Sequence, residues 1–189
     1  METMIGRAKG MLLEPRATWK EIDTEFTKSG ELWLKYIAPL AAIGPIALTV
    51  GMILFGRRVP LTSLTTPASM SSAIQAGVAS YVLALLSVFV LSRVISLLAP
   101  GFGGQRNDVQ GLKAAAYSST AAWVGGIFQI LPALGLVSLL FALYSLVLLY
   151  LGLPIVMKAP KDRAMGYTAV VIIVSIVVYL IAGAIVTAF

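Results

Sequence analysis

Residues 112–154 read LKAAAYSSTAAWVGGIFQILPALGLVSLLFALYSLVLLYLGLP, and this stretch decides the fold. A helix needs about 20 apolar residues to cross the hydrocarbon core of a bilayer. The stretch holds two such windows, residues 112–131 and 134–154, which are separated only by Pro132 and Ala133. Windows this close in the chain predict a tight antiparallel hairpin whose uncharged turn lies at a membrane face.

The rest of the chain adds three more apolar windows, at residues 33–55, 73–98 and 166–188. Hydrophobic residues make up 59% of the 189 and charged residues only 12%, and the mean hydropathy is +0.93, far from the values of soluble domains. We therefore predict an all-α fold, a polytopic membrane bundle of five transmembrane helices formed by residues 33–189.

The first 32 residues are of a different character, because charged and apolar residues alternate along them. Pro15 is placed to begin a helix, which Thr18 and Glu21 can help to cap. Five apolar residues share one face of this segment: Met11, Leu12, Trp19, Ile22 and Phe26. The pattern predicts an amphipathic segment along the cytoplasmic interface of the membrane, serving as an anchor for the first span or as a docking surface for a cytoplasmic partner.

The positive charges predict the orientation. With five spans the termini lie on opposite sides, and of the 14 lysines and arginines only Arg57 and Arg58 fall on the side away from the N-terminus. The positive-inside rule then places the N-terminus in the cytoplasm and the C-terminus outside. Arg57 and Arg58 begin a flexible connector rich in Ser, Thr and Pro, residues 56–72, where they can contact lipid phosphates. The bases form no dense run with interleaved aromatics, so the net charge of +6 does not indicate nucleic-acid binding.

The composition also excludes most catalytic chemistry. The chain has no cysteine and no histidine, the residues behind thiolate nucleophiles, thiolate zinc sites and imidazole bases. No carboxylate lies inside any apolar window, so a proton relay within the membrane lacks its usual groups. We predict no catalytic residue, no metal site and no cofactor.

Candidate contact residues gather near the predicted cytoplasmic ends of the spans. Arg93 lies inside the second window, where its side chain can extend to the interface, or reach Asp108 or the carbonyls that end a neighbouring helix. Topology alone accounts for the bases of the segment at residues 158–163, although a contact role remains open. The candidates for binding anionic headgroups or a partner are Arg93, Arg106, Asp108, Lys158, Lys161 and Arg163.

The third window carries small residues every four positions, at Ala114, Ser118, Ala122 and Gly126. Such a face is nearly flat and lets another helix approach closely. The pattern predicts packing within the bundle or an interface between copies of the chain.

Four segments carry a resemblance to a known family: residues 11–22, MLLEPRATWKEI; residues 36–47, YIAPLAAIGPIA; residues 103–135, GGQRNDVQGLKAAAYSSTAAWVGGIFQILPALG; and residues 143–172, LYSLVLLYLGLPIVMKAPKDRAMGYTAVVI. The chain resembles the bacterial branch of the Yip (Ypt-interacting-protein) family of five-span membrane proteins. The resemblance implies a helical bundle with a cytoplasmic N-terminus and supplies no catalytic residue. Eukaryotic relatives are associated with Rab-type GTPases through a longer N-terminal region than residues 1–32, so we carry over no such partner.

These observations favour a non-enzymatic protein of the bacterial inner membrane that acts as a lipid-organising or partner-binding module. Its expected partners are anionic lipids on the cytoplasmic side, and other membrane proteins or further copies of itself. The alternative is a small-solute or ion transporter or channel, in which Pro39, Pro45 and Pro132 break the helices around a cavity.

Overall fold

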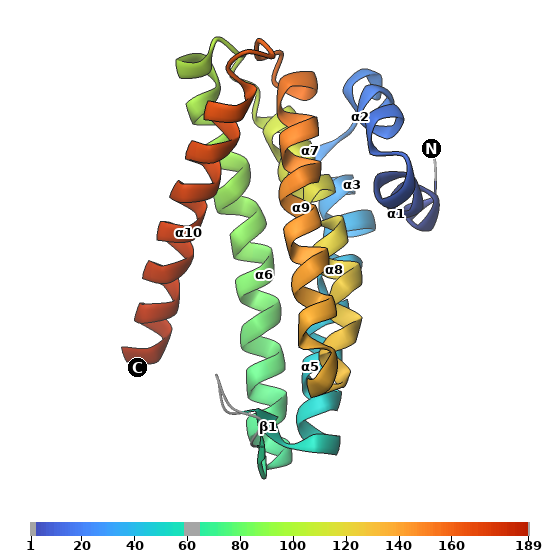
Figure 1. Cartoon of the computed structure of the whole chain (residues 1–189), viewed down its shortest axis with the longest axis vertical. Helices are drawn as coiled ribbons and strands as arrows, with labels where there is room; N and C mark the ends of the chain where they lie inside the picture. Colours follow the sequence, from blue (N-terminus) through green and yellow to red (C-terminus); the bar gives the residue numbers. More distant parts are fainter. Residues whose placement is uncertain (1–2, 59–64, 189) are drawn as a thin grey trace.

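The computed structural model describes residues 3–58 and 65–188, and nearly all of them are helical (Figure 1). The N-terminal half contains α1 (Met4–Leu13), α2 (Pro15–Thr24), α3 (Ser29–Leu32), η1 (Trp33–Ile37), α4 (Ala38–Ala41), α5 (Ile43–Phe55), β1 (Arg57–Arg58), β2 (Thr65–Thr66) and α6 (Met70–Leu98). The C-terminal half contains η2 (Ala99–Phe102), α7 (Asp108–Ser118), α8 (Thr120–Gly125), η3 (Gly126–Ile130), η4 (Pro132–Leu134), α9 (Gly135–Val156) and α10 (Ala164–Ala188).

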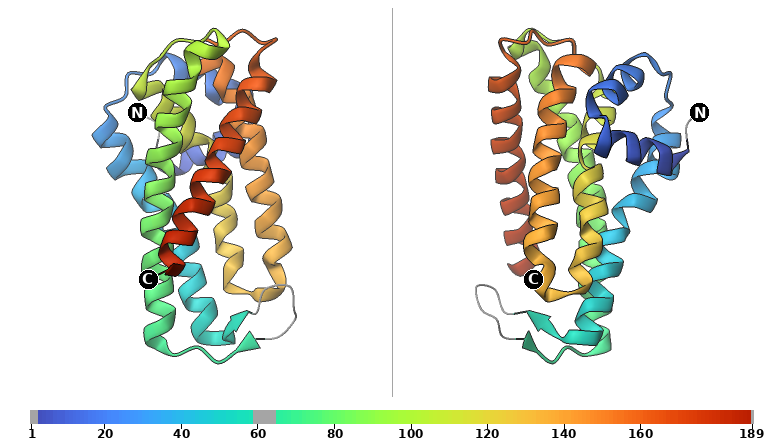
Figure 2. Two further views of the ribbon diagram at one scale, coloured as in Figure 1. Left: turned by 90° about the vertical axis from the view of Figure 1, so that its left-hand side faces the viewer. Right: turned by 45° about the vertical axis from the view of Figure 1, so that its right-hand side comes forward.

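Three helical runs in the described residues are long and apolar enough to cross a membrane: Ser29–Phe55, Met70–Phe102 and Gly135–Val156. A shorter apolar helical stretch, Ala164–Val177, lies in α10. The runs stand roughly parallel, and the loops after α6 and α9 lie together at one end of the molecule (Figures 1 and 2). We call this the loop end, and the end with β1 and β2 the hairpin end.

The first run is bent rather than straight because proline lacks the N–H that a helix needs. The helix begins with a short turn at Ser29, passes through a π-helical turn at Trp33–Ile37, and reaches Pro39 just beyond it. There the N–H of Ala38 bonds to the carbonyl of Trp33, five residues back. A second interruption at Ala42 precedes Pro45. The predicted span of residues 33–55 is therefore a chain of short helical pieces.

The third predicted span, residues 112–131, is not one continuous α-helix. It begins earlier, at Asp108, where the side chain of Asn107 accepts from the N–H groups of Val109 and Gln110 and caps the helix. It breaks between α7 and α8, where the hydroxyl of Ser119 bonds back to the carbonyl of Ala115. After the Gly125–Gly126 pair the chain continues as the tighter 3-10 helix η3. The apolar composition of residues 112–131 therefore did not indicate either of the two interruptions.

The predicted hairpin between the third and fourth windows is present. The chain reverses over residues 131–134, and α9 then runs antiparallel beside α8 and α7 (Figure 2). The N–H of Ala122 donates to the hydroxyl of Ser145 at 2.8 Å, which ties α8 to α9.

The core surrounds α7. Every residue of α7 from Gly111 to Ser118 is buried, because α6 and α9 pack against this helix while α2 and α3 approach it from the N-terminal segment. At Gly111 an added Cβ would lie 2.7 Å from the carbonyl oxygen of Ser92, so only glycine allows α7 to approach α6 this closely.

The N-terminal segment forms two helices, with Pro15 at the first position of α2 as predicted. Its apolar side faces the bundle, which corrects the expectation that this side lies among lipid headgroups. Met11, Trp19 and Ile22 are fully buried, whereas Phe26 is 84% exposed and does not share their face.

The cap predicted for α2 from Thr18 and Glu21 is not the arrangement in the structure. Thr18 donates its hydroxyl to the carbonyl of Glu14, and the side chain of Glu21 is engaged elsewhere. The connector predicted over residues 56–72 is described at its ends, where Arg57–Arg58 pair with Thr65–Thr66 as an antiparallel ribbon. The side chains of Arg57 and Arg58 lie outside the described part of the chain, so their predicted phosphate contacts are not addressed.

Candidate functional site

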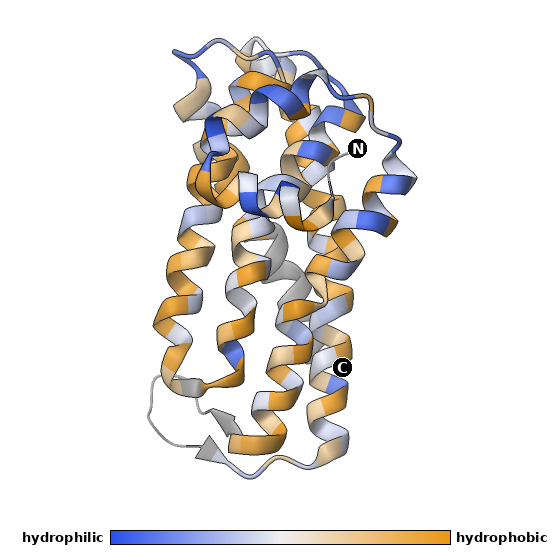
Figure 3. Ribbon diagram, turned by 90° about the vertical axis from the view of Figure 1, so that its right-hand side faces the viewer, coloured by the Kyte–Doolittle hydropathy of each residue, from blue (hydrophilic) through white to orange (hydrophobic). Residues whose placement is uncertain are grey.

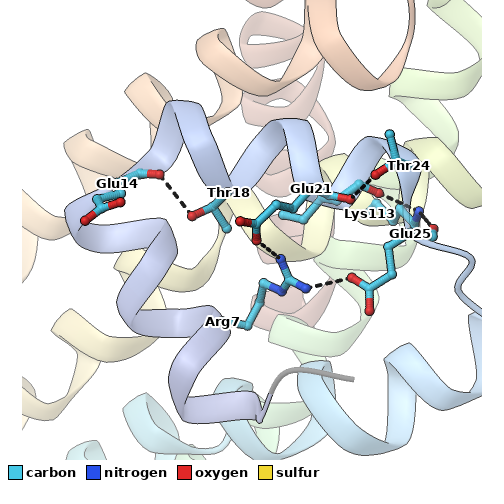
Figure 4. Close-up of polar contacts among 8 residues, drawn as sticks. Arg7, Glu14, Thr18, Glu21, Thr24, Glu25 and Lys113 are labelled. Atoms are coloured by element: carbon cyan, nitrogen blue, oxygen red, sulfur yellow. Dashed lines mark hydrogen bonds and ion pairs between the residues drawn. The ribbon is translucent and has the colours of Figure 1, made fainter.

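The N-terminal helices α1 and α2, residues 4–24, form a shoulder that packs on one side of the bundle near the loop end (Figure 2). Arg7 of α1 is buried, and the two arms of its guanidinium group reach Glu21 of α2 and Glu25, the residue directly after α2. One nitrogen lies 3.2 Å from the carboxylate of Glu21 and the other 2.7 Å from that of Glu25 (Figure 4). A buried arginine is tolerated only when it is paired in this way, so these contacts fix α1 against α2.

Lys113 of α7 joins the shoulder to the core. Its ammonium group donates to the carbonyl of Ile22 at 2.8 Å and to that of Glu25 at 2.5 Å, and the residue is only 2% exposed (Figure 4). The last carbonyls of a helix have no partner within the helix, and they form its negative end. Lys113 therefore satisfies the C-terminal end of α2 with a positive charge. Gln110, one turn earlier in α7, donates its amide to the carbonyl of Asp23 at 3.3 Å.

Lys158 holds the same end of α2 from the other side. It follows α9 with a φ of 55°, and its ammonium group pairs with the carboxylate of Asp23. The sequence predicted Lys158 to contact lipid or a partner. In the structure the side chain of Lys158 is half-exposed, and its ion pair joins the loop after α9 to the shoulder.

Trp19 is the apolar anchor of the shoulder. The residue is fully buried, and its indole N–H donates to the carbonyl of Leu148 in α9 at 3.1 Å. The ring lies over Gly152, where an added Cβ would come within 2.5 Å of the indole carbons. The ring also meets Tyr117 edge-on, with centroids 6.2 Å apart. Gly152 therefore provides the hollow in α9 that receives the largest side chain of the shoulder.

Arg93 and Asp108 lie together at the loop end. A guanidinium nitrogen of Arg93 is 2.5 Å from one carboxylate oxygen of Asp108, and the hydroxyl of Ser96 donates to the other at 2.6 Å. The Ser96 hydrogen bond, followed by the charges of Arg93 and Arg106, holds the pKa of Asp108 below its ordinary value of 3.8. Of the alternatives left open for Arg93, the structure shows the contact with Asp108.

Arg106, Lys161 and Arg163 are exposed in the two loops of the loop end. The structure thus brings the predicted contact residues to one end of the molecule and divides them by their surroundings. Lys158 holds the shoulder and Arg93 pairs with Asp108, whereas Lys161 and Arg163 project from the loop before α10.

The predicted small-residue face is shared between two neighbours. Ala114, Ser118 and Gly126 are buried and Ala122 is partly buried. An added Cβ at Gly126 would lie 2.7 Å from the Cα of Gly44, so this end of the face meets α5. Ala122 lies where α8 meets Ser145 of α9. The face does not continue along one helix, because the backbone is interrupted after Ser118.

A cavity of about 260 Å³ lies where α1 meets the start of the first long run. Both positively and negatively charged side chains line the cavity. The rings of Tyr36 and Tyr117 also line it and contact each other, with centroids 4.7 Å apart. The lining residues are Thr3, Met4, Arg7, Glu25, Thr27, Glu31, Leu32, Lys35, Tyr36 and Tyr117. Among the described residues no group of three acidic, histidine or cysteine side chains is placed to hold a metal ion.

Sequence reasoning missed the residues that hold the shoulder. Lys113 and Arg7 were counted only among the bases that predict the orientation. The available signal was the position of Lys113 at the second residue of an apolar window, where a buried ammonium group needs acceptors. Its partners are carbonyls 88 and 91 residues away in sequence, which no local pattern reveals.

Comparison with known proteins identifies a family. A family model described as the Yip1 domain matches residues 9–183, which includes α2, all the long helical runs and both loops of the loop end. No curated protein and no solved structure matches the chain.

Proposed function

The chain belongs to the Yip1 domain family of non-enzymatic, multi-pass membrane proteins, and on this premise we propose that it organises lipids or binds a partner at the loop end. The proposal includes that the protein is a member of the bacterial branch of the family, lies in the inner membrane and has five spans. Its partners are anionic headgroups, with other membrane proteins or further copies of itself as further candidates.

Two interrupted or shorter segments complete the five proposed spans. Residues 112–131 cover most of α7, α8 and η3, and residues 166–188 lie within α10. Support for a third span comes from the antiparallel packing of α8 on α9, which carries the chain from the loop end to the hairpin end and back. The proposed orientation places the loop end in the cytoplasm, where the positive-inside rule places most bases.

The observation that carries the proposal is that some lysines and arginines near the loop end are bound to other groups of the chain, whereas others are exposed. Arg7, Lys113 and Lys158 are engaged with groups of the chain itself, and Arg93 pairs with Asp108. Lys161 and Arg163 are exposed in a loop at the end of the bundle. A pair of exposed bases at the proposed cytoplasmic interface attracts anionic headgroups, at about 1 kcal/mol for each base.

The test is lipid retention measured by native mass spectrometry of protein released from nanodiscs of phosphatidylethanolamine and phosphatidylglycerol. The variant Lys161→Gln/Arg163→Gln is expected to retain less phosphatidylglycerol. Arg57→Gln/Arg58→Gln is the matched control, because it removes the same charge from the hairpin end. Equal retention in both variants and the unchanged protein contradicts lipid binding by this loop.

A transport assay addresses the alternative function. Proteoliposomes containing the purified protein are expected to show no saturable, selective flux of ions or small solutes. A flux of that kind would show that the protein is a transporter or channel and not a lipid-organising or partner-binding module.

A further inference from the structure

The cavity between α1 and the start of the first long run is small and carries balanced charges. Its volume of about 260 Å³ lies below the roughly 300 Å³ at which pockets for drug-sized ligands begin. Among the described residues, two bases and two acids line it: Arg7, Lys35, Glu25 and Glu31. Glu21 adds a negative charge nearby, because it also pairs with Arg7. The cavity therefore suits a small zwitterionic group better than an anion.

The cavity lies at the depth expected for lipid headgroups. The first long run covers Ser29–Phe55, and its charged residues, Glu31 and Lys35, both lie among its first seven. The rest of the run, residues 36–55, extends about 30 Å at 1.5 Å per residue, which is the thickness of a bilayer core. In the hydropathy view the lower part of the bundle is largely hydrophobic and hydrophilic residues gather toward the loop end (Figure 3). Glu31 and Lys35 therefore lie just outside the core, on the side of the loop end.

Two interruptions of the helices meet at the wall of the cavity. Tyr36 belongs to the π-helical turn η1, and its hydroxyl oxygen lies 2.7 Å from that of Thr120, the first residue of α8. Tyr117 lies just before the break between α7 and α8, and its ring contacts that of Tyr36. Single π-helical turns occur frequently at functional sites. The two tyrosine rings thus place both irregular segments beside the charged groups.

The charged groups of the cavity are available to a ligand. Glu31 and Lys35 form a pair one turn apart at 3.4 Å, with side chains 36% and 67% exposed. An exposed pair of this kind contributes little to stability, so a ligand can take the place of either partner. Glu25 uses its Oε2 atom for Arg7, and its side chain is 29% exposed. The ring of Tyr36 adds an attraction for an ammonium group over its face.

We propose that this cavity binds the headgroup of a zwitterionic phospholipid, phosphatidylethanolamine, from the leaflet at the loop end. Glu25 and Glu31 accept hydrogen bonds from the primary ammonium group of the lipid, which lies beside the ring of Tyr36. Lys35 holds the lipid phosphate. The inference rests on the membrane function proposed above and adds to it a second site, which takes a zwitterionic lipid rather than an anionic one.

The surroundings of the cavity favour a membrane lipid over a free solute. Ile5, Phe26 and Leu34 are each adjacent in sequence to a residue of the lining, and they are 75%, 84% and 78% exposed. Large apolar side chains exposed at the depth of the headgroups are typical of surfaces that lie against lipid. A headgroup in the cavity leaves its glycerol and acyl chains beside these side chains.

Native mass spectrometry tests the selectivity, with protein released from nanodiscs of phosphatidylethanolamine, phosphatidylcholine and phosphatidylglycerol. The unchanged protein is expected to retain severalfold more phosphatidylethanolamine than phosphatidylcholine. Both lipids are zwitterionic, but a primary ammonium group donates hydrogen bonds to carboxylates and a quaternary one has no N–H to donate. Equal retention of the two lipids overturns the proposal.

Two variants assign the selectivity to the cavity. Glu31→Gln removes an acceptor charge, and Thr27→Phe fills the cavity from the connection after α2. Each is expected to lower the ratio of phosphatidylethanolamine to phosphatidylcholine severalfold. Glu14→Gln is the matched control, because Glu14 is an exposed glutamate of the shoulder that does not line the cavity. A ratio in either cavity variant equal to that of the control overturns the assignment.

The absence of cysteine from the sequence permits a direct test of position. Thr27→Cys and the neighbouring Phe26→Cys are treated with a water-soluble maleimide in nanodiscs of phosphatidylglycerol with either phosphatidylethanolamine or phosphatidylcholine. Thr27→Cys is expected to react severalfold more slowly with phosphatidylethanolamine present, and Phe26→Cys equally fast in both. Equal protection of the two positions overturns the proposal. Protection of Thr27→Cys in detergent by soluble glycerophosphoethanolamine as strong as that by the lipid overturns the assignment to a membrane lipid.

The outcomes also separate this inference from the proposed function. Loss of phosphatidylglycerol from Lys161→Gln/Arg163→Gln, without selectivity for phosphatidylethanolamine in the unchanged protein, removes the cavity lipid alone. Selectivity that Glu31→Gln abolishes, with phosphatidylglycerol fully retained by Lys161→Gln/Arg163→Gln, removes lipid binding by the loop alone.

Discussion

Helices α2 and α10 both pack against α9, and they are held in opposite ways. Helix α2 has ten residues with several charges, yet Trp19, Lys113 and Lys158 bind it to three other parts of the chain. Helix α10 has 25 residues and no charged one. Within residues 164–177, whose burial the structure describes, the buried residues of α10 lie near its start, where Tyr167 bonds to the carbonyl of Ile95 and stacks on Phe102 with centroids 5.0 Å apart.

Farther along α10 the exposed fraction rises, to 59% at Ile173 and 53% at Ile176. The difference teaches that in a membrane protein apolar composition does not indicate how tightly a helix is packed. Lipid chains are as apolar as leucine, so an apolar helix can leave its neighbours without exposing its side chains to water. The polar α2 must satisfy its charges and carbonyl groups inside the protein, and those contacts hold it in place.

The largest expected effect comes from removing the anchor of α2. Trp19→Ala removes a fully buried ring and leaves a cavity against Gly152, which costs about 3–5 kcal/mol in the free energy of unfolding. Chemical unfolding in mixed micelles, followed by circular dichroism, measures the loss. Gly152→Ala perturbs the contact from the other side, because its Cβ would overlap the indole, and is expected to destabilise α2 as well. A stable Gly152→Ala variant with unchanged Trp19 fluorescence contradicts the packing described.

The next effect concerns the cation at the end of α2. Lys113→Met keeps the length of the side chain but leaves the carbonyls of Ile22 and Glu25 without their donor. The expected destabilisation is about 1–3 kcal/mol, in the same unfolding experiment. Lys161→Met is the control, since Lys161 is exposed, and it should change stability little. Equal losses in the two variants show that Lys113 is not a structural cation.

A smaller effect is expected at the start of α10. Tyr167→Phe removes the hydroxyl that donates to the carbonyl of Ile95 and keeps the ring stacked on Phe102, so the cost is about 0.5–1.5 kcal/mol. Protease accessibility of the loop before α10 reports local loosening. If this variant loosens α2 as much as α10, the two attachments are coupled, and the comparison between them does not hold.

The smallest effect is the pH dependence of the Arg93–Asp108 pair, which lies outside both attachments. The pKa of Asp108 is lowered in the folded protein, so its contribution to stability is complete above the ordinary pKa of 3.8 and is lost as the pH falls through the lower, folded value. From neutral pH to about pH 5, Asp108→Asn should therefore shift the unfolding midpoint by a constant, small amount. A difference between variant and unchanged protein that varies across this range contradicts the lowered pKa.

The sequence was sufficient for the parts of the fold that depend on length and composition. The hairpin before α9 followed from two apolar windows separated by Pro132 and Ala133, and the start of α2 followed from Pro15. The break at Ser118–Ser119 was not predictable from apolar content, because serines are compatible with a membrane helix until their hydroxyls compete for the backbone. The orientation of Trp19 was missed for a related reason, since an amphipathic pattern gives the apolar face and does not say whether protein or lipid covers it.

The candidate site was predictable only in part. The bases of the loop end could be found by their positions at the ends of apolar windows. Their division into structural and exposed groups could not be predicted, because it depends on long-range contacts. Lys158 and Asp23 are 135 residues apart, and Trp19 and Leu148 are 129 apart. These separations carry no local signal, whereas the contact of Arg93 with Asp108, 15 residues away, was one of the alternatives that the sequence left open.

The central claim is that the polar shoulder is an integral part of the folded bundle, and amide hydrogen exchange in nanodiscs tests it most directly. Peptides covering residues 18–24 of α2 are expected to exchange about as slowly as peptides from the buried helix α7, and much more slowly than residues 26–30, where the connection after α2 joins the start of the first long run. Lys113→Met should raise the exchange rate of α2 selectively. Exchange of α2 in the unchanged protein as fast as that of residues 26–30 would contradict the claim.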